Sequence, residues 1–567
     1  MAGGTVLLVE IMTSVRRLFP QLVVAAATGQ AQGNRLAQVA DSDHLPAVDI
    51  LITYCGEGDE IVLNTAKAAC ACDYPSELLR VVVLDDSHSH KLARNIEELS
   101  QQRPHLSYAS RNLEIKTHSK ASNLNFGIRY LESLGKGKAP FLAVLDADMI
   151  PAPSWLRCVL PHVLNNDRAA LACPFQHFYN VPAGDPLNTK AEMLPLEAAN
   201  LLQDFSDNAW CLGTGFVMRV SALEAIGGVP EISLQEDVLM TSYLASAGWH
   251  SVYVPEPVQW GLAPDTMAAF LKQCQRWTVG LVSLLDLEQS GKVGNSSNKE
   301  RLNVAMWGVL LCVEAFAWTF ALVALPLCVL RGKLLIPPLQ AGQLRLLLRL
   351  ATLDFLTQTI YHIGLSSVLD WRLPFDGIPT PVWTQPWRMM IVLRYFLVPK
   401  LLGRDPPNFT PTGMSSDGDA ERAARANRSR LACCKVVLWD CGAWFHLAIF
   451  GVCMAGAGFR FTAALGDAVR EDARQVDLGS LTCIAWPPVL FLWAAITKAA
   501  WLPLAYGLWP PPLAAQDTLT ARDTKRDVDY PSEGVKRKYL RKAGQWSFVV
   551  KCVVYLISLV AVETSRV

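Results

Sequence analysis

Charged residues are scarce in this chain of 567 residues. Asp, Glu, Lys and Arg make up 18% of it and hydrophobic residues 51%, whereas soluble domains usually carry about 25% charged residues. Acidic and basic side chains balance to a net charge of zero, which gives no support for a nucleic-acid partner. The composition therefore predicts that part of the chain lies in a lipid bilayer.

Closely spaced cysteine pairs of the metal-binding or redox type are also missing. Fifteen cysteines are scattered without any C-x-x-C spacing, which argues against a zinc or thioredoxin-type site. Several lie in apolar runs, as free thiols in a reducing compartment do. Cys433 and Cys434 lie at the edge of an apolar segment, where acylation is one alternative.

The N-terminal segment, residues 1–46, is apolar but interrupted by Arg16 and Arg17. No positive region precedes its apolar run, so we do not expect a cleaved signal peptide. A helix on the membrane surface and a single poor spanning segment fit this segment equally well.

Residues 47–300 read as a cytosolic α/β domain. Apolar, β-branched runs predict buried strands, and stretches of helical length lie between them. The strands are predicted at 47–54, 79–86, 141–148 and 250–257, and the helices at 60–72, 90–101 and 120–133. This alternation predicts a mainly parallel sheet covered on both faces. Ligands bind at the carboxyl ends of the strands in such sheets, so acidic residues there are the first candidates.

Residues 301–567 read as a membrane region with about five spans. Apolar stretches here approach or exceed the roughly 20 residues that cross a bilayer. They are 304–330, 350–369, 434–457, 480–507 and 547–563. Residues 386–402 are apolar but contain Arg388, Arg394 and Lys400, which is typical of an interfacial helix.

Basic connectors set the expected topology. Connectors 420–430 and 522–542 are strongly basic and should face the cytosol by the positive-inside rule. Connector 331–349 disagrees, because it is basic but the count of spans places it outside. Polar groups within the spans either line a channel or are buried between helices. They are Glu314, Asp354, His362 and Asp440.

Acidic residues follow the predicted strands one after another. Asp85 and Asp86 end one strand, and Asp146 and Asp148 form a D-x-D at the end of another. Carboxylates so placed can share Mg²⁺ or Mn²⁺ with a diphosphate, because these cations prefer oxygen ligands. One such pair alone is more often a solvated turn. The repetition after successive strands, with Glu236, Asp237 and Glu256 following, is what favours a site.

Three further segments carry groups suited to phosphate and sugar, although each alone could be an ordinary helix start or turn. They are Lys120 with Asn123 and Asn125, the turn Gly213–Thr214–Gly215, and Gln273 with Arg276 and Trp277. Glycines in such a turn allow the backbone to approach a ligand closely. The last group lies just before the first long apolar stretch.

In this order, the motifs resemble those of the processive glycosyltransferases of family 2, the superfamily of cellulose, chitin and hyaluronan synthases. The likeness covers about residues 47–280 and is greatest to fungal cell-surface polysaccharide synthases. It implies a glycosyltransferase-A-type domain. The implied nucleotide, diphosphate and acceptor contacts are Asp85, Asp86, Lys120, Asp146, Gln273, Arg276 and Trp277. The implied ligands of Mg²⁺ or Mn²⁺ are Asp146 and Asp148, and the implied general base is Asp237.

Two motifs depart from the family pattern and one matches in part. Ser122 replaces a glycine in the segment around Lys120, and the acceptor-side motif reads "WCLGT" at 210–214, which leaves the acceptor open. "FTPTG" at 409–413, within a connector at 403–432, resembles the gating loop of cellulose synthases.

We therefore expect an inverting, metal-dependent hexosyltransferase that extends a β-linked extracellular or cell-wall polysaccharide from a UDP-sugar. It would be a multi-pass protein of the plasma membrane with its catalytic domain in the cytosol. The alternative is non-processive transfer of one sugar to a lipid or another hydrophobic acceptor, favoured by the weak N-terminal span and the altered acceptor motif. A catalytically inactive scaffold is a third interpretation, disfavoured because every acidic position is filled.

Overall fold

The computed structural model describes most of the chain. The described residues are 45–111, 119–135, 137–204, 208–289, 298–331, 382–403, 418–470, 487–513 and 516–542, with separate residues at 350–372 and 549–553. The predictions for residues 1–44 and for "FTPTG" lie outside them, as do most of 547–563 and nearly half of 350–369, including Asp354 and His362.

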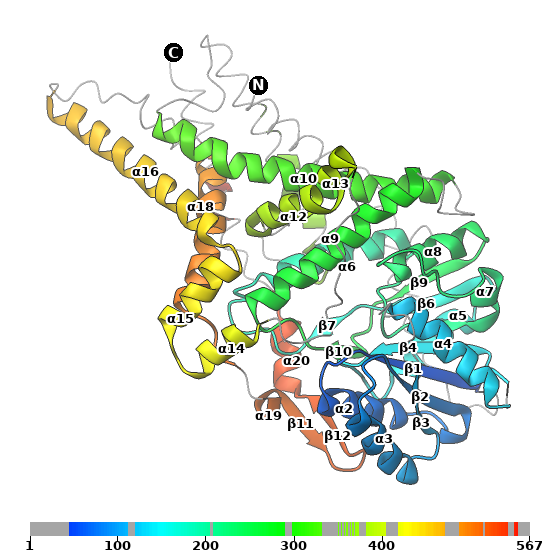
Figure 1. Ribbon diagram of the computed structural model, residues 1–567. Coiled ribbons are helices and arrows are strands. Elements are labelled where there is room, and N and C mark those ends of the chain that lie inside the picture. Colours follow the sequence, from blue (N-terminus) through cyan, green and yellow to red (C-terminus); the bar gives the residue numbers. More distant parts are fainter. Residues whose placement is uncertain are drawn as a thin grey trace.

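A seven-stranded sheet forms the centre of the α/β domain (Figure 1). Its order is β3-β2-β1-β4-β8-β6-β9, and only β8 runs antiparallel to its neighbours. The strands are β1 (Val48–Tyr54), β2 (Leu79–Asp85), β3 (Leu106–Ser110), β4 (Phe141–Asp146), β6 (Ala169–Pro174), β8 (Val217–Arg219) and β9 (His250–Val254). The predicted mainly parallel α/β domain is confirmed.

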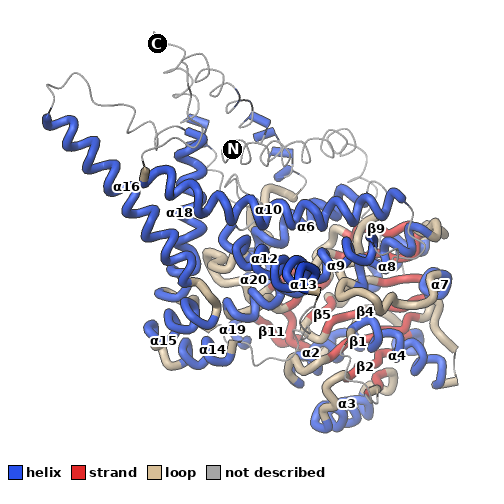
Figure 2. The backbone as a smooth tube through the Cα atoms, turned by 45° about the horizontal axis from the view of Figure 1, so that its top comes forward, coloured by secondary structure: helices blue, strands red, loops and turns tan. Residues whose placement is uncertain are grey.

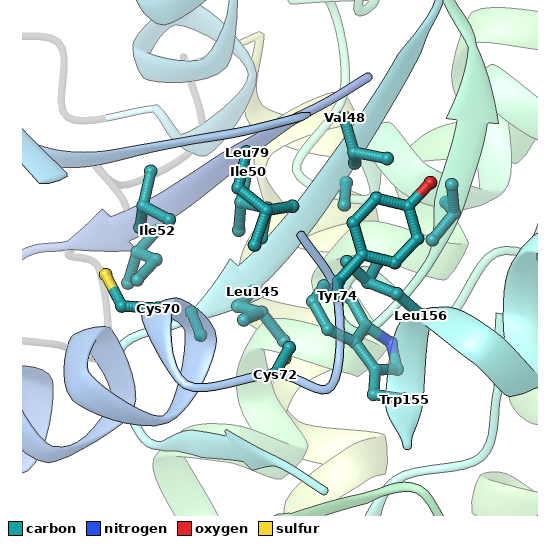
Figure 3. Close-up of a cluster of buried hydrophobic side chains, with 14 of the residues drawn as sticks. Val48, Ile50, Ile52, Cys70, Cys72, Tyr74, Leu79, Leu145, Trp155 and Leu156 are labelled. Atoms are coloured by element: carbon teal, nitrogen blue, oxygen red, sulfur yellow. The ribbon is translucent and has the colours of Figure 1, made fainter. Parts of the chain in front are cut away.

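Helices cover both faces of this sheet, which explains why its strands are nearly continuous apolar runs. Side chains alternate along a strand, so Ile50 and Ile52 of β1 face one core and Leu51 faces the other. The first core, shown in Figure 3, is closed by α2 (Asp59–Cys70), α3 (His90–Gln102) and α5 (Trp155–Leu164). The second is closed by α4 (Lys120–Ser133), α7 (Val220–Ala225) and α8 (Glu236–Ser246).

A smaller sheet and a distant hairpin complete the domain. The small sheet contains β5 (Met149–Pro151), β10 (Gln259–Gly261) and β7 (His177–Phe178), and the hairpin contains β11 (Thr520–Asp523) and β12 (Val528–Pro531). Asn64 of α2 and the backbone of Asp529 exchange two hydrogen bonds of 2.9 and 2.8 Å. α20 (Glu533–Tyr539) follows the hairpin. The small sheet, the hairpin and α20 contribute side chains to one apolar cluster. The basic connector 522–542 is therefore a folded element docked on the α/β domain.

Long helices leave the α/β domain on one side (Figures 1 and 2). They are α9 (Met267–Gln289), α10 (Asn298–Leu330), α16 (Trp444–Arg470) and α18 (Pro487–Leu508). α6 (Thr189–Asp204) packs against β9 of the sheet. Within the described residues, one helix is long and apolar enough to cross a membrane, at Val304–Cys328 of α10. It coincides with the first predicted span, and the other spans stay predictions.

The predicted span 434–457 is not one straight helix. α15 (Arg430–Lys435) continues as the π-helical turn η4 (Val436–Asp440), and α16 then starts at Trp444 at an angle of 98°. Gly442 lies in the bend with a φ of 75°, a conformation that glycine adopts without the clash of a Cβ atom. The sequence shows the apolar run but not this break.

The predicted interfacial segment is helical throughout the described part. It contains α12 (Gln385–Val392), the π-helical η3 (Leu393–Leu397) and α13 (Val398–Leu402). Arg394 and Lys400 are exposed, whereas Arg388 is buried in an ion pair with Glu192 of α6. Arg388 therefore joins this segment to the α/β domain, and its interfacial placement stays a prediction.

Candidate active site

The D-x-D lies at the carboxyl end of β4, in the middle of the sheet. Thr53 is the cross-strand partner of Asp146, and its Oγ1 donates to Asp146 Oδ1 at 3.2 Å. The backbone N–H of Asp146 donates to Thr214 Oγ1 at 2.9 Å. Burial and the charge of Asp146 raise the pKa of Asp148 to about 7. The two carboxylates are thus held close together, at the edge where ligands bind in such sheets.

Lys120 joins the D-x-D to the glycine turn. Its Nζ forms an ion pair with Asp146 and donates to the carbonyl oxygen of Gly213 at 2.7 Å. Burial acts to lower its pKa, but the charges of Asp146 and Glu236 outweigh burial and raise it to about 12. Ser119 caps α4 and so fixes where Lys120 begins the helix. A stable cation therefore faces the predicted diphosphate position.

Asp237 lies at the start of α8, close to both cations of the site. Burial raises its pKa above the ordinary value, while the charges of Lys120 and Arg276 act in the opposite direction. Burial and the charge of Asp237 raise the pKa of its neighbour Glu236 to about 7. The two cations favour the ionised form of Asp237, which is the form that can accept a proton.

The glycine turn allows the backbone to pass directly beside Asp237. Gly213 has a φ of 84°, and a Cβ atom there would lie 2.9 Å from Asp237 Oδ2. Gly215 has a φ of 71°, and a Cβ atom there would overlap the Gln259 amide. Neighbouring side chains therefore require glycine at both positions, whereas the predicted close approach of this turn to a ligand stays a prediction.

Gln273, Arg276 and Trp277 share one face of α9, because they are three and four positions apart. The charge of Arg276 acts to lower the pKa of both Asp148 and Asp237, so its guanidinium lies within electrostatic range of the carboxylates. Trp277 packs at the edge of the apolar cluster of the small sheet. The helix thus brings this motif to the same site as the D-x-D.

Asp85 organises the loop after β2. Its two carboxylate oxygens accept from the backbone N–H groups of Ser87, His88 and Ser89 at 2.6, 3.1 and 2.7 Å. The Tyr108 hydroxyl donates to it at 2.8 Å. These hydrogen bonds use much of the accepting capacity of the Asp85 carboxylate. The predicted contact of Asp85 with the nucleotide stays a prediction.

Asp86 is held by an arginine that the sequence did not single out. Arg111 donates to both oxygens of Asp86, from Nε at 2.6 Å and from Nη2 at 2.8 Å, and also contacts Ser122. Ser122 is the residue that replaces the family glycine. Arg111 has no motif around it, and only its position after the neighbouring strand β3 could have suggested it.

Glu57 is the second residue that sequence reasoning missed. It follows β1, and its Oε2 accepts from the Cys55 backbone N–H at 2.7 Å. Burial raises its pKa to about 7, and the charges of Asp148 and Asp146 act in the same direction. The rule that acids follow the strands could have found it, because β1 ends at Tyr54.

The carboxylates around Asp148 fit a divalent cation shared with a diphosphate. Mg²⁺ commonly takes one or two carboxylates together with substrate phosphates. In the part of the chain that the structure describes, no group of three or more His, Cys, Asp and Glu residues is arranged to hold a metal by itself. Burial is the largest cause of the raised pKa of Asp148, and the charge of Asp146 adds to it; a cation would relieve this repulsion between the two carboxylates.

Comparison with known proteins agrees with this architecture. Residues 46–280 match the model of the family described as "Glycosyltransferase like family 2". These residues form a glycosyltransferase family 2 domain. A cellulose synthase 1 catalytic subunit (UDP-forming) of Komagataeibacter xylinus is 27% identical over 256 residues, covering 44% of this chain and 32% of that protein. A cellulose synthase catalytic subunit (UDP-forming) of Xanthomonas axonopodis pv. citri is 27% identical over 256 residues, covering 44% and 33%.

The family 2 domain is thus homologous to processive cellulose synthases, and the match spans about a third of the length of these relatives. Among solved structures, the mannosyltransferase PcManGT from Pyrobaculum calidifontis, in complex with GDP-Man and Mn²⁺, is 16% identical with a TM-score of 0.43. It covers 65% of this chain and 99% of that one. TarS 1–349 of S. aureus is 14% identical with a TM-score of 0.32, covering 46% and 70%.

Proposed function

We propose that this protein is a membrane-bound inverting glycosyltransferase that transfers hexose units from a UDP-sugar to a growing β-linked polysaccharide. The observation that carries the proposal is the convergence of Lys120, Asp146, Asp237 and Arg276 at the carboxyl ends of the strands. The UDP-forming relatives favour a UDP-sugar as the donor. The fungal likeness of the sequence stays a prediction.

The reaction would be a single displacement at the anomeric carbon. Asp237 takes the proton of the acceptor hydroxyl while that oxygen forms the new bond to the anomeric carbon. The bond from this carbon to the diphosphate breaks, its electron pair leaves with UDP, and attack from the opposite face inverts the configuration. Lys120 and Arg276 offset the charge that develops on the leaving diphosphate.

Asp146 and Asp148 would hold Mg²⁺ or Mn²⁺, which supplies further positive charge for the diphosphate when bound. Trp277 would give the acceptor sugar a flat apolar face. Because Lys120 contacts Asp146 and lies beside Asp237, it connects the diphosphate side of the site with the proton acceptor.

The contacts of the connectors support a common, cytosolic location. α14 (Asp419–Ala426) is bound to Asp265, before α9, and the β11–β12 hairpin is bound to α2. Both connectors that the positive-inside rule assigns to the cytosol thus contact the family 2 domain, which supports a shared location on the side where UDP-sugars would be supplied. A multi-pass protein of the plasma membrane is the arrangement we propose.

Membranes containing the protein, incubated separately with radiolabelled UDP-glucose, UDP-N-acetylglucosamine and UDP-glucuronate, test the proposal. Labelled polymer retained on gel filtration supports it, and a single glycolipid product supports one-sugar transfer instead. Asp237→Asn keeps the size of the side chain but cannot accept the proton, so transfer should fall at least about a hundredfold while UDP still binds. Transfer near the wild-type rate would remove Asp237 from this role.

A further inference from the structure

The first turn of α9 receives a hydrogen-bond acceptor from a segment far along the chain. The backbone N–H of Met267, the first residue of α9, donates to Glu421 Oε2 of α14 at 2.9 Å. N–H groups in the first turn have no partner within their own helix. A carboxylate there satisfies the N–H group and complements the positive end of the helix dipole. Glu421 therefore caps the Met267 N–H of the helix that carries Arg276 and Trp277, next to Thr266, whose Oγ1 accepts from the Ala269 N–H at 3.2 Å.

Glu421 is itself fixed by partners from three segments. Its side chain is fully buried, and its other oxygen, Oε1, accepts from the Tyr506 hydroxyl of α18 and from Arg425 Nη1 at 3.4 Å. Arg425 also donates to the backbone carbonyl oxygens of Asp265 and Pro511 at 2.5 and 2.6 Å. A buried carboxylate costs little when it is paired and hydrogen-bonded in this way, and its position becomes well defined.

A second contact holds α14 at the same end of α9. Arg422 donates to both oxygens of Asp265, from Nε at 3.0 Å and from Nη2 at 2.8 Å. Gly418, directly before α14, has a φ of 105° and lies against Thr266. α14 thus hydrogen-bonds Asp265 and Met267 on either side of Thr266, which restrains the start of α9.

The position of this cap matters for the site because α9 is continuous from Met267 to Gln289. Arg276 lies nine residues after Met267, roughly 14 Å along the axis at about 1.5 Å per residue. A shift or fraying of the first turns would therefore be passed to the face that carries Gln273, Arg276 and Trp277.

We propose that Glu421 is a positioning residue for sugar transfer, which holds Arg276 and Trp277 in register with Asp237 by capping α9. This inference rests on the proposed transferase function. It assigns α14 and the Tyr506 contact of α18 a role in keeping the acceptor side of the site aligned, without contact to substrate.

The test compares Glu421→Ala with Glu421→Gln in the full-length protein in membranes, with rates normalised to UDP-binding sites. Glu421→Ala removes the acceptor of the Met267 N–H and leaves the bond from the Ala269 N–H to Thr266 Oγ1 in place. A resulting displacement of about 1 Å at Arg276 should lower kcat on the order of a hundredfold. KM for the donor should change less than kcat, because Lys120 and Asp146 also face the diphosphate position and do not lie on α9, although Arg276 does. Glu421→Gln keeps one oxygen for the Met267 N–H and should restore kcat to within about tenfold of wild type.

Asp49→Asn is the matched control. Asp49 is buried and paired with both Nε and Nη2 of Arg80 at 2.6 and 2.7 Å, at the opposite end of β1 from the site. Asp49→Asn should lower the amount of folded protein in the membranes but leave kcat per UDP-binding site at the wild-type value. If Glu421→Ala does the same, Glu421 is only structural and the proposal is wrong.

Two further outcomes are distinguishable. If Glu421→Ala does not fold, Tyr506→Phe carries the test, because it removes one hydrogen bond to Glu421 and no apolar surface. A fall in kcat of about twofold or more at unchanged KM, the scale of one hydrogen bond, supports the proposal, and an unchanged kcat overturns it. A wild-type protein that transfers no sugar from any donor would contradict the proposed function instead.

Discussion

Replacing Gly213 by alanine tests whether the glycine turn sets the position of the base. Gly213 has a φ of 84°, and an added Cβ atom would lie 2.9 Å from Asp237 Oδ2 and 3.5 Å from Lys120 Nζ. Ordinary contacts of a Cβ atom begin at 3.4 Å, so the carboxylate would have to move by 3.4 − 2.9 = 0.5 Å. The substitution therefore acts on the proposed proton acceptor before it acts on anything else.

Two effects of different size follow from this geometry. The left-handed backbone should lower the free energy of unfolding by about 1–2 kcal/mol, since an L-residue clashes with its own carbonyl there. A 1 Å misplacement of reacting groups can cost about a hundredfold in rate, so half that displacement should cost roughly tenfold in kcat. UDP binding should change little, because the clash is with Asp237 rather than with the D-x-D.

Gly248→Ala separates the two effects. Gly248 has the same φ of 84°, and nothing lies within 4 Å of its added Cβ atom. Denaturant unfolding should show a similar loss of stability for both variants, whereas radiolabelled sugar transfer per folded molecule should fall only for Gly213→Ala. Equal kcat in the two variants would refute the reasoning that Gly213 makes room for the base.

Three further predictions concern the metal, the pH dependence and the topology. Chelation with EDTA should abolish transfer and Mn²⁺ or Mg²⁺ should restore it, with Asp148→Asn requiring more metal; full activity in chelator would exclude the D-x-D as a metal site. Transfer should be lost as pH falls through the raised pKa of Asp237, because protonation removes the base. Lys120 acts to lower that pKa, so Lys120→Gln should move the acid limb of the pH–rate profile to higher pH, and an unmoved limb would contradict its proximity to Asp237. The sequon at Asn427, exposed at the end of α14, should carry no glycan in a eukaryotic host, while a sequon introduced at 458–477 should; glycan on Asn427 would place the family 2 domain outside the cytosol.

Much of the family 2 domain could be predicted because its signals are local. The strands are buried on both faces, so their sequences are apolar runs that need no partner to be recognised. Asp85, Asp86, Asp146 and Asp148 follow these runs, at the edge of the sheet where parallel strands end. Asp237, which was also expected after a strand, starts α8 instead. Glu57 obeys the same rule and was missed only because two residues separate it from its strand.

The membrane part was less predictable for two physical reasons. The hydrophobicity of a segment indicates that it is buried or in lipid, but not whether its helix is continuous. The 98° bend after Asp440 depends on Gly442, which has a left-handed backbone conformation. A basic residue in an apolar segment reads as a group that reaches the lipid surface. Arg388 instead pairs with Glu192, 196 positions away, and no local pattern indicates such a partner.

By itself, the sequence determined the alternation of strands and helices, the acids at the strand ends and the order of the motifs, because each depends on residues within a few positions of one another. Only the tertiary structure decided that Arg111 holds Asp86, that Gly213 makes room for Asp237 and that Glu421 caps α9. These contacts join segments 24 to 154 positions apart, beyond the reach of helix or strand periodicity, so only the packing of the whole fold brings the partners together.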